Sequence, residues 1–324
     1  MLRTIVRLIP ALRLTRVTTT FAVVANIWFV ILWTRATPEE PGRAQLHDGS
    51  VWLQVFGGFL LAAGLYSFAA ASNDLLDIRQ DRALKPDRPL ASGALSPPSA
   101  MAVIVGSLVG AAFGASVMGL WSVRLTLILT LGILFYNFAG RHFPSVRFVT
   151  LGLIYAFHMF IPNPRLVFLW PIWAAMTHSL AVAAITHSLA GGRPALSRGA
   201  IAGATAGWFF WSAALLGLGW HRAGAIWPDW VHAQGAMYVG GLVLVFALLV
   251  WRIVRQGAGR QSADRVMRLG AFWLALYSAA WLLGQGYIQE GIGIASVAVV
   301  GFALAVGLHT LAARIDQPLD YRLS

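Results

Sequence analysis

The sequence contains no cysteine and few charged residues. Without cysteine there can be no disulfides, thiolate nucleophiles, c-type haem attachment or Cys-ligated zinc or iron–sulfur sites. Charged residues make up 11% of the 324 positions, whereas soluble domains have about a quarter. Hydrophobic residues make up 58%, and the mean hydropathy is +0.70. This composition excludes a soluble enzyme, a disordered chain and a water-soluble nucleic-acid-binding protein.

Long apolar runs bounded by charge recur along the chain and predict an all-α, polytopic membrane bundle of nine or ten helices. Helices are expected because backbone amides in hydrocarbon need internal partners, and the runs are too long and too uniformly apolar for barrel strands. The count stays open because the fifth run is short and the last two are separated by few residues. The runs are 17–34, 51–73, 99–120, 123–139, 147–162, 166–189, 198–219, 236–253, 266–287 and 291–313.

The distribution of basic residues predicts the orientation of the bundle. With the N-terminus in the cytoplasm, only five of the 24 basic residues fall in outer segments, as the positive-inside rule requires. We therefore expect a multi-pass protein of the cytoplasmic membrane, with residues 1–16 as a basic interfacial segment. The excess positive charge is explained by orientation and by attraction to anionic lipid, so no nucleic-acid partner is expected. Tryptophans at the predicted outer ends are interpreted as interfacial anchors: Trp33, Trp52, Trp121, Trp170, Trp220, Trp227 and Trp230.

Acidic residues are scarce, and four of the twelve lie at the predicted cytoplasmic end of the second span. Asn73, Asp77 and Asp81 are four residues apart, so their oxygens share one face if the helix continues beyond the membrane. Such oxygens suit Mg²⁺, which is usually shared with substrate phosphates. The alternative is a solvated loop over 74–98 whose mixed charges cap a helix and obey the positive-inside rule.

Basic residues follow these aspartates directly. They are Arg82, Lys85 and Arg88, and Lys85 is the only lysine of the chain. Carboxylates that hold a metal, followed by cations that hold phosphate oxygens, are typical of a diphosphate site. The sequence therefore predicts such a site at the membrane boundary, where ionisable residues are functional candidates.

The string NDLLDIRQDRALKPDRPLASG, at residues 73–93, resembles the first aspartate-rich motif of the UbiA superfamily of intramembrane prenyltransferases. That pattern is N-D-x-x-D-x-x-x-D followed by K-P-x-R-P-L-x-S-G, and every fixed position is present. The pattern of spans also resembles the family along almost the whole chain. The resemblance implies one domain over residues 1–324, with helices around a central cavity that opens to lipid and a cytoplasmic loop over 74–98.

The resemblance also implies an activity and a set of site residues. The family transfers a prenyl group from a polyprenyl diphosphate, bound through Mg²⁺, to an aromatic or other lipophilic acceptor. No obligate protein partner is implied. Carried over by position, Asn73, Asp77 and Asp81 are metal ligands, Asp74 is a ligand or a partner of one, and Asp74, Asp77 and Asp81 form the catalytic group. Lys85, Arg88, Arg141 and Arg193 are the corresponding diphosphate contacts, although Arg141 is explained equally well by the positive-inside rule.

The second aspartate-rich motif of the family, D-x-x-x-D, is missing. The corresponding stretch, 186–198, has no carboxylate and carries Ser188, Ala190 and Gly192 about where acidic residues are expected. Arg193, Arg198 or His187 could supply the missing positive charge. Alternatively, the chain uses a different phosphorylated isoprenoid, or binds one without turnover. His178 and His187 are nine residues apart, on opposite helix faces, and so cannot chelate one ion.

The leading hypothesis is thus a Mg²⁺-dependent membrane prenyltransferase. A terpene cyclase of the same family or another lipid-diphosphate transferase is the alternative enzyme, and a non-catalytic isoprenoid-binding homologue is the alternative without activity. A transporter is disfavoured, because the charges cluster in one segment and not at mid-membrane positions. Two polar positions inside spans, Asn26 and Gln54, either contact an acceptor or form hydrogen bonds between helices.

Overall fold

The computed structural model describes residues 10–86, 88–138, 140 and 143–315, and these residues form helices and connecting turns without a β-strand. The long helices are α2 (Val17–Ala36), α4 (Val51–Leu76), α6 (Pro97–Ser116), α7 (Leu120–Phe138), α8 (Pro144–Phe160), α9 (Trp170–Leu189), α10 (Arg198–Ala223), α11 (Ala233–Gln256), α12 (Arg260–Gly284) and α13 (Ile288–Ile315). Two short helices, α3 (Arg43–His47) and α5 (Ile78–Leu84), join them. The predicted all-α membrane bundle is confirmed, with ten long helices within the described ranges.

Eight of these helices are long and apolar enough to cross a membrane. The two others are α8, which has only 17 residues, and α9, which carries polar side chains such as His178 and His187 along its length. Each predicted span coincides with one long helix to within a few residues. Apolar runs bounded by charge thus located the helices well, because hydrocarbon requires continuous apolar segments.

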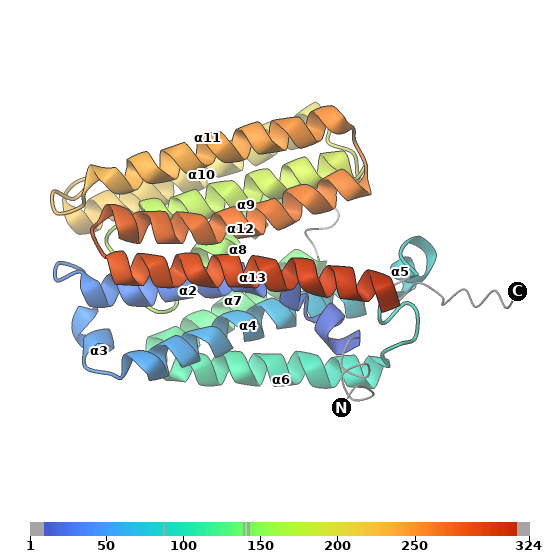
Figure 1. Ribbon diagram of the computed structural model, residues 1–324, viewed down its shortest axis with the longest axis horizontal. Helices are drawn as coiled ribbons and strands as arrows, with labels where there is room; N and C mark the ends of the chain where they lie inside the picture. Colours follow the sequence, from blue (N-terminus) through green and yellow to red (C-terminus); the bar gives the residue numbers. More distant parts are fainter. Residues whose placement is uncertain (1–9, 87, 139, 141–142, 316–324) are drawn as a thin grey trace, which may run out of the picture.

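The long helices lie side by side and alternate in direction along the chain (Figure 1). One end of the bundle carries the junction of α4 and α5, and we call it the aspartate end. At the other end, which we call the opposite end, α3 connects α2 with α4. The stretch 74–98, predicted as a loop, is helical up to Leu84. The predicted site residues that the structure describes therefore lie at the aspartate end, in the last turn of α4, in α5 or in the connections there.

Helices α2 and α12 form the centre of the bundle. The apolar window of α2 is 67% buried and that of α12 is 61% buried, whereas α10 and α11 are each 17% buried. The two central helices contact each other, and α13 packs against both. One hydrophobic core joins α2 with α8, α9 and α12, and a second joins α2 with α4, α6 and α7. Because α2 contributes to both cores, it fixes the position of α4 and its C-terminal aspartates.

Glycines allow α4 and α6 to pack with their backbones in contact. A Cβ atom at Gly114 of α6 would overlap the carbonyl oxygen of Gly57 and the amide nitrogen of Leu61 on α4. A Cβ at Gly64 of α4 would likewise overlap the carbonyl oxygen of Ser107. Small residues commonly permit this close approach between membrane helices. The packing holds α4, and with it the aspartate end, against α6.

Polar contacts close the opposite end of the bundle. Glu40 is 2% exposed, and its carboxylate accepts hydrogen bonds from Trp33 Nε1 (3.1 Å), Val167 N (2.9 Å) and Phe168 N (3.2 Å). Burial raises the pKa of Glu40, and these hydrogen bonds oppose the shift. Trp33 was expected to anchor at the headgroup boundary, but it is 1% exposed and packs on Phe168, so that expectation is wrong. Trp52, by contrast, is 80% exposed.

The close contact between α4 and α6 gives a stability prediction. We expect Gly114→Ala to lower the free energy of unfolding by about 1–3 kcal/mol, because the added methyl group must push two backbones apart. Gly106→Ala on the same helix is the control, since a Cβ there meets nothing within 4 Å. Thermal unfolding in detergent measures both variants, and equal midpoints for the two would contradict the packing described.

Candidate functional site

The first aspartate-rich stretch lies at the junction of α4 and α5. The regular helix ends at Leu76, because Asp77 adopts φ −93° and ψ 3°. Backbone hydrogen bonds nevertheless continue at a spacing of four residues, from Asp77 N to Asn73 O (3.0 Å) and from Asp81 N to Asp77 O (2.8 Å). The predicted continuous helix is therefore interrupted at Asp77, while the four-residue register persists.

Two polar groups connect the side chains of this stretch. Asn73 Nδ2 donates to Asp77 Oδ2 over 3.3 Å and to Asp74 Oδ1 over 3.5 Å. Arg88 Nη1 lies 2.9 Å from Asp74 Oδ1 and 2.5 Å from Asp81 Oδ2. The side chains of Asp74 and Asp81 are each 6% exposed. The structure thus joins Asp81 to Asp74 through a cation, whereas the sequence placed Asp81 on one face with Asn73 and Asp77.

Arg16 is a site residue that the sequence analysis missed, because it was assigned only to a basic interfacial segment. Its Nη2 lies 3.3 Å from Asp74 Oδ1, so the residue directly before α2 contributes a second cation to the same carboxylate. Burial lowers the pKa of Arg16, but the nearby Asp74, Tyr66 and Tyr136 raise it by more. Arg16 is therefore positively charged at any physiological pH.

Three tyrosines lie close enough to Arg16 to interact with it electrostatically: Tyr66 of α4, Tyr136 of α7 and Tyr155 of α8. The Tyr66 hydroxyl is 2.7 Å from Thr19 Oγ1 of α2. Helices α4, α7 and α8 therefore bring phenol groups near the guanidinium that precedes α2. Only the tertiary structure reveals this group, since its members are up to 139 positions apart in the sequence.

The predicted diphosphate contacts are distributed unevenly around this site. Arg88 lies within it. Lys85 follows α5, and its side chain is exposed. Partial desolvation of its ammonium group and the charge of Arg88 both lower its pKa. Arg193 is exposed in the connection between α9 and α10. Arg141, like Asp87, lies outside the described residues, so its role stays a prediction.

The stretch that replaces the second motif is organised by His187. Its Nε2 is 2.9 Å from the carbonyl oxygen of Pro194, and its own carbonyl accepts a hydrogen bond from Gly192 N (2.8 Å). A Cβ atom at Gly192 would overlap the His187 ring. His178 instead contacts the carbonyl oxygen of Gly270 on α12 at 2.9 Å. The two histidines thus serve different structural contacts, and position 192 has no room for an acidic side chain unless His187 moves.

The donor atoms of the first stretch fit a divalent cation. Asp74 and Asp81 already converge on one positively charged group, Arg88 Nη1, and both contribute carboxylate oxygens. Mg²⁺ prefers oxygen ligands and is usually bound by only one or two carboxylates together with substrate phosphates and water. Within the described ranges, no three His, Asp or Glu side chains are arranged to hold a metal by themselves. The arrangement therefore suits a metal that a substrate helps to bind.

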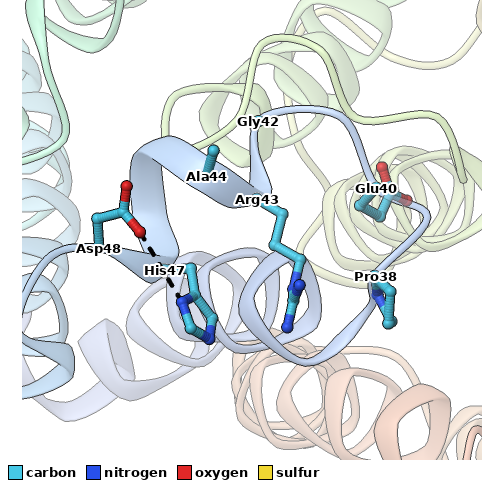
Figure 2. A pocket seen from close by; sticks show the side chains of 7 residues that line it. All are labelled: Pro38, Glu40, Gly42, Arg43, Ala44, His47 and Asp48. Atoms are coloured by element: carbon cyan, nitrogen blue, oxygen red, sulfur yellow. Dashed lines mark ion pairs between the residues drawn. The ribbon is translucent and has the colours of Figure 1, made fainter.

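The opposite end of the bundle has an open hollow beside α3, but it is not a second acidic site. It is lined by Pro38, Glu40, Gly42, Arg43, Ala44, His47 and Asp48. Figure 2 shows Asp48 facing His47, 4.0 Å away, with Glu40 apart from both. Glu40 is occupied by its three hydrogen bonds. The carboxylates of this hollow therefore do not converge on one point, in contrast to Asp74 and Asp81.

A sequence model of a known family matches most of the chain. The model of the UbiA prenyltransferase family matches residues 41–273, which include both stretches discussed above. The chain belongs to the UbiA prenyltransferase family. The resemblance inferred from residues 73–93 is thereby confirmed. No curated protein matches the chain significantly.

Solved structures share the fold of this UbiA family member. A UbiA homologue from Archaeoglobus fulgidus has 16% sequence identity and a TM-score of 0.56, covering 89% of this chain and 99% of its own. A structure of digeranylgeranylglyceryl phosphate synthase has 15% identity and a TM-score of 0.52, covering 87% of this chain and 99% of its own. At these identities the likeness shows the fold alone.

The bridging position of Arg88 gives a prediction about stability. We expect Arg88→Gln to lower the free energy of unfolding by about 3 kcal/mol, because it leaves two buried carboxylates without their shared cation. Added Mg²⁺ should restore part of this loss in the variant. Arg82→Gln on α5, an exposed neighbour, is the control. Thermal unfolding with and without Mg²⁺ provides the measurement, and a variant as stable as the control would contradict the bridge.

Proposed function

We propose that the chain is a Mg²⁺-dependent membrane prenyltransferase that transfers a prenyl group from a polyprenyl diphosphate to an aromatic or other lipophilic acceptor and releases diphosphate. One observation carries the proposal: the buried carboxylates of Asp74 and Asp81 converge on a single cation at the end of a membrane bundle. Membership of the UbiA prenyltransferase family supports it. The bilayer supplies both lipophilic substrates, and we take residues 1–324 as one domain.

The residues of the aspartate end would divide the work of ionising the donor. Asp74, Asp77, Asp81 and Asn73 would hold Mg²⁺, which when bound supplies positive charge next to the departing diphosphate. Arg88 would have to leave the carboxylates to admit the metal, and its guanidinium could then contact the diphosphate oxygens. Lys85, Arg141 and Arg193 are proposed as further contacts to the diphosphate.

The tyrosines behind Asp74 fit the second half of the reaction. Breaking the carbon–oxygen bond of an allylic diphosphate leaves a carbocation, which must be kept from water until the acceptor attacks. The faces of Tyr66, Tyr136 and Tyr155 would stabilise that positive charge and exclude water. Arg16 pairs with Asp74 and interacts electrostatically with these tyrosines. The predicted central cavity would lie beside the three rings.

The same site would also serve a terpene cyclase or another lipid-diphosphate transferase, since both begin with the same ionisation. The missing second motif keeps a non-catalytic isoprenoid-binding protein as the other alternative. We propose that the chain is a multi-pass protein of the cytoplasmic membrane, with its N-terminus and aspartate end on the cytoplasmic side. The excess of basic residues in the predicted inner segments supports this orientation.

Release of diphosphate from geranyl, farnesyl and longer donors, with Mg²⁺ and then with EDTA, tests the proposed function. We expect release with Mg²⁺ and none with EDTA. Asp77→Ala and Asp81→Ala should each slow release at least about a hundredfold, because the metal contributes several kcal/mol of transition-state stabilisation. Asp264→Ala changes an exposed aspartate at the start of α12 and is the control. Release unaffected in both motif variants would remove this site from consideration.

The products of the same assay separate the alternatives. A prenylated acceptor supports the transferase. Diphosphate release without an adduct would favour cyclisation, and binding of donors without any release would favour the non-catalytic homologue.

Acidic substitutions in the stretch 186–198 form a further test. Ser188 is exposed at the end of α9, so Ser188→Asp should be accepted and should raise the rate of release if the second metal site is merely degenerate. Gly192→Asp should instead lower the thermal midpoint, because its Cβ overlaps His187. Rates and midpoints of both variants provide the measurement, and an unchanged midpoint for Gly192→Asp would contradict the close packing of His187.

A further inference from the structure

Arg147 is a basic residue at the aspartate end that has no role in the site described so far. It lies in the first turn of α8, and its side chain is partly buried. Its Nε donates to the hydroxyl of Tyr136 on α7 over 3.3 Å, and its guanidinium carbon lies 5.8 Å from the centre of that ring. The guanidinium of Arg147 is therefore held against the end of α7.

The end of α7 is in turn fixed against the aspartate stretch. Asn137 follows Tyr136, and its Nδ2 donates to Ser72 Oγ over 2.9 Å and to the carbonyl oxygen of Ala69 over 3.1 Å. Ser72 directly precedes Asn73, the first residue of the stretch. Two consecutive residues of α7 thus hold Arg147 on one side and the end of α4 on the other.

Tyr136 also brings Arg147 close to the other cations of the site. Tyr136 interacts electrostatically with Arg16, and Arg16 pairs with Asp74. One phenol group therefore adjoins two guanidinium groups, of which one already has a carboxylate partner.

The charge of Arg147 is not neutralised by a neighbouring side chain. Within the described residues, Arg147 forms no ion pair, whereas Arg16 and Arg88 are paired with aspartates. Its one hydrogen bond to a described residue uses Nε, so the two terminal NH₂ groups have no partner there. A guanidinium presents these groups as a planar fork that matches the oxygens of a phosphate. A partly buried fork of this kind is suited to bind an anionic ligand.

The first turn of α8 also lies against the stretch that replaces the second motif. Phe148, the neighbour of Arg147, contacts the ring of His187 edge-on, with centroids 5.5 Å apart. One turn of α8 thus packs on the end of α7 through Arg147 and on the end of α9 through Phe148. Arg147 therefore lies in the turn that separates the first aspartate-rich stretch from residues 186–198.

We infer that Arg147 binds the diphosphate group of the donor through its terminal NH₂ groups while Nε stays on Tyr136. It supplies positive charge next to the stretch 186–198, which has no carboxylate with which to hold a metal. The inference rests on the proposed function, because it takes the ligand to be a prenyl diphosphate. It concerns binding, however, so it can be tested without an acceptor and without turnover.

Equilibrium binding of tritiated farnesyl diphosphate to the protein in detergent micelles, in EDTA and then with Mg²⁺, tests the inference. We expect Arg147→Gln to weaken binding about tenfold in both conditions, because a charge-assisted contact to the diphosphate is lost. Arg147→Lys keeps the positive charge and should recover part of the affinity. Farnesol has the same chain without the diphosphate, so its affinity should be equal in all three proteins. A loss of farnesol binding that matched the loss of donor binding would overturn the inference.

Arg255→Gln is the matched control at the same end of the bundle. Arg255 also lies over an aromatic ring, 4.1 Å from the centre of Trp251, but at the exposed end of α11. Its replacement should leave donor binding unchanged. Equal losses in Arg147→Gln and Arg255→Gln would overturn the inference, because they would indicate a general effect of surface charge.

Three further outcomes bear on the inference. Unchanged donor affinity in Arg147→Gln would overturn it and leave the proposed function in place. Displacement of the donor by phosphatidylglycerol as readily as by inorganic diphosphate would assign Arg147 to lipid headgroups and would overturn it as well. If the unaltered protein bound no farnesyl diphosphate with or without Mg²⁺, the inference and the proposed donor would both be wrong.

Discussion

Two buried carboxylates that require a cation determine the character of the aspartate end. Asp74 and Asp81 are nearly inaccessible to solvent, and each is held within hydrogen-bonding distance of Arg88. Burying two neighbouring carboxylates costs free energy unless positive charge lies between them. The site therefore holds Arg88 in this structure and is suited to hold a divalent metal in its place. Arg16 and the three tyrosines behind it extend the same electrostatic arrangement into the bundle.

The bundle holds this site by close backbone contact and by two hydrophobic cores. Glycines bring α4 against α6, and α2 takes part in both hydrophobic cores, so the end of α4 has little freedom to move. The opposite end is closed by Glu40, whose carboxylate ties the segment after α2 to the segment before α9. The bundle therefore has one end closed by buried hydrogen bonds and one end that carries the charged site.

The missing second motif has a structural counterpart. Where family members carry two aspartates, this chain has a tight connection in which the carbonyl oxygen of Pro194 and the small Gly192 surround His187. The segment therefore differs in packing as well as in charge, because a side chain at position 192 would overlap His187 unless that ring moved. Under the proposed function, positive charge for the diphosphate from this side would come from residues such as Arg193.

The sequence by itself determined the membrane bundle, the positions of its spans and the first aspartate-rich motif. Apolar length and the spacing of charged residues are local properties, and hydrocarbon leaves a chain few ways to satisfy its backbone. Only the tertiary structure decided which carboxylates meet, that Arg16 joins them, that Trp33 is buried, and that Ser278 of α12 donates to Asn26 of α2. These relations depend on how helices far apart in the sequence are turned toward each other. Nearly uniform apolar helices carry little information about their own rotation, so packing had to supply it.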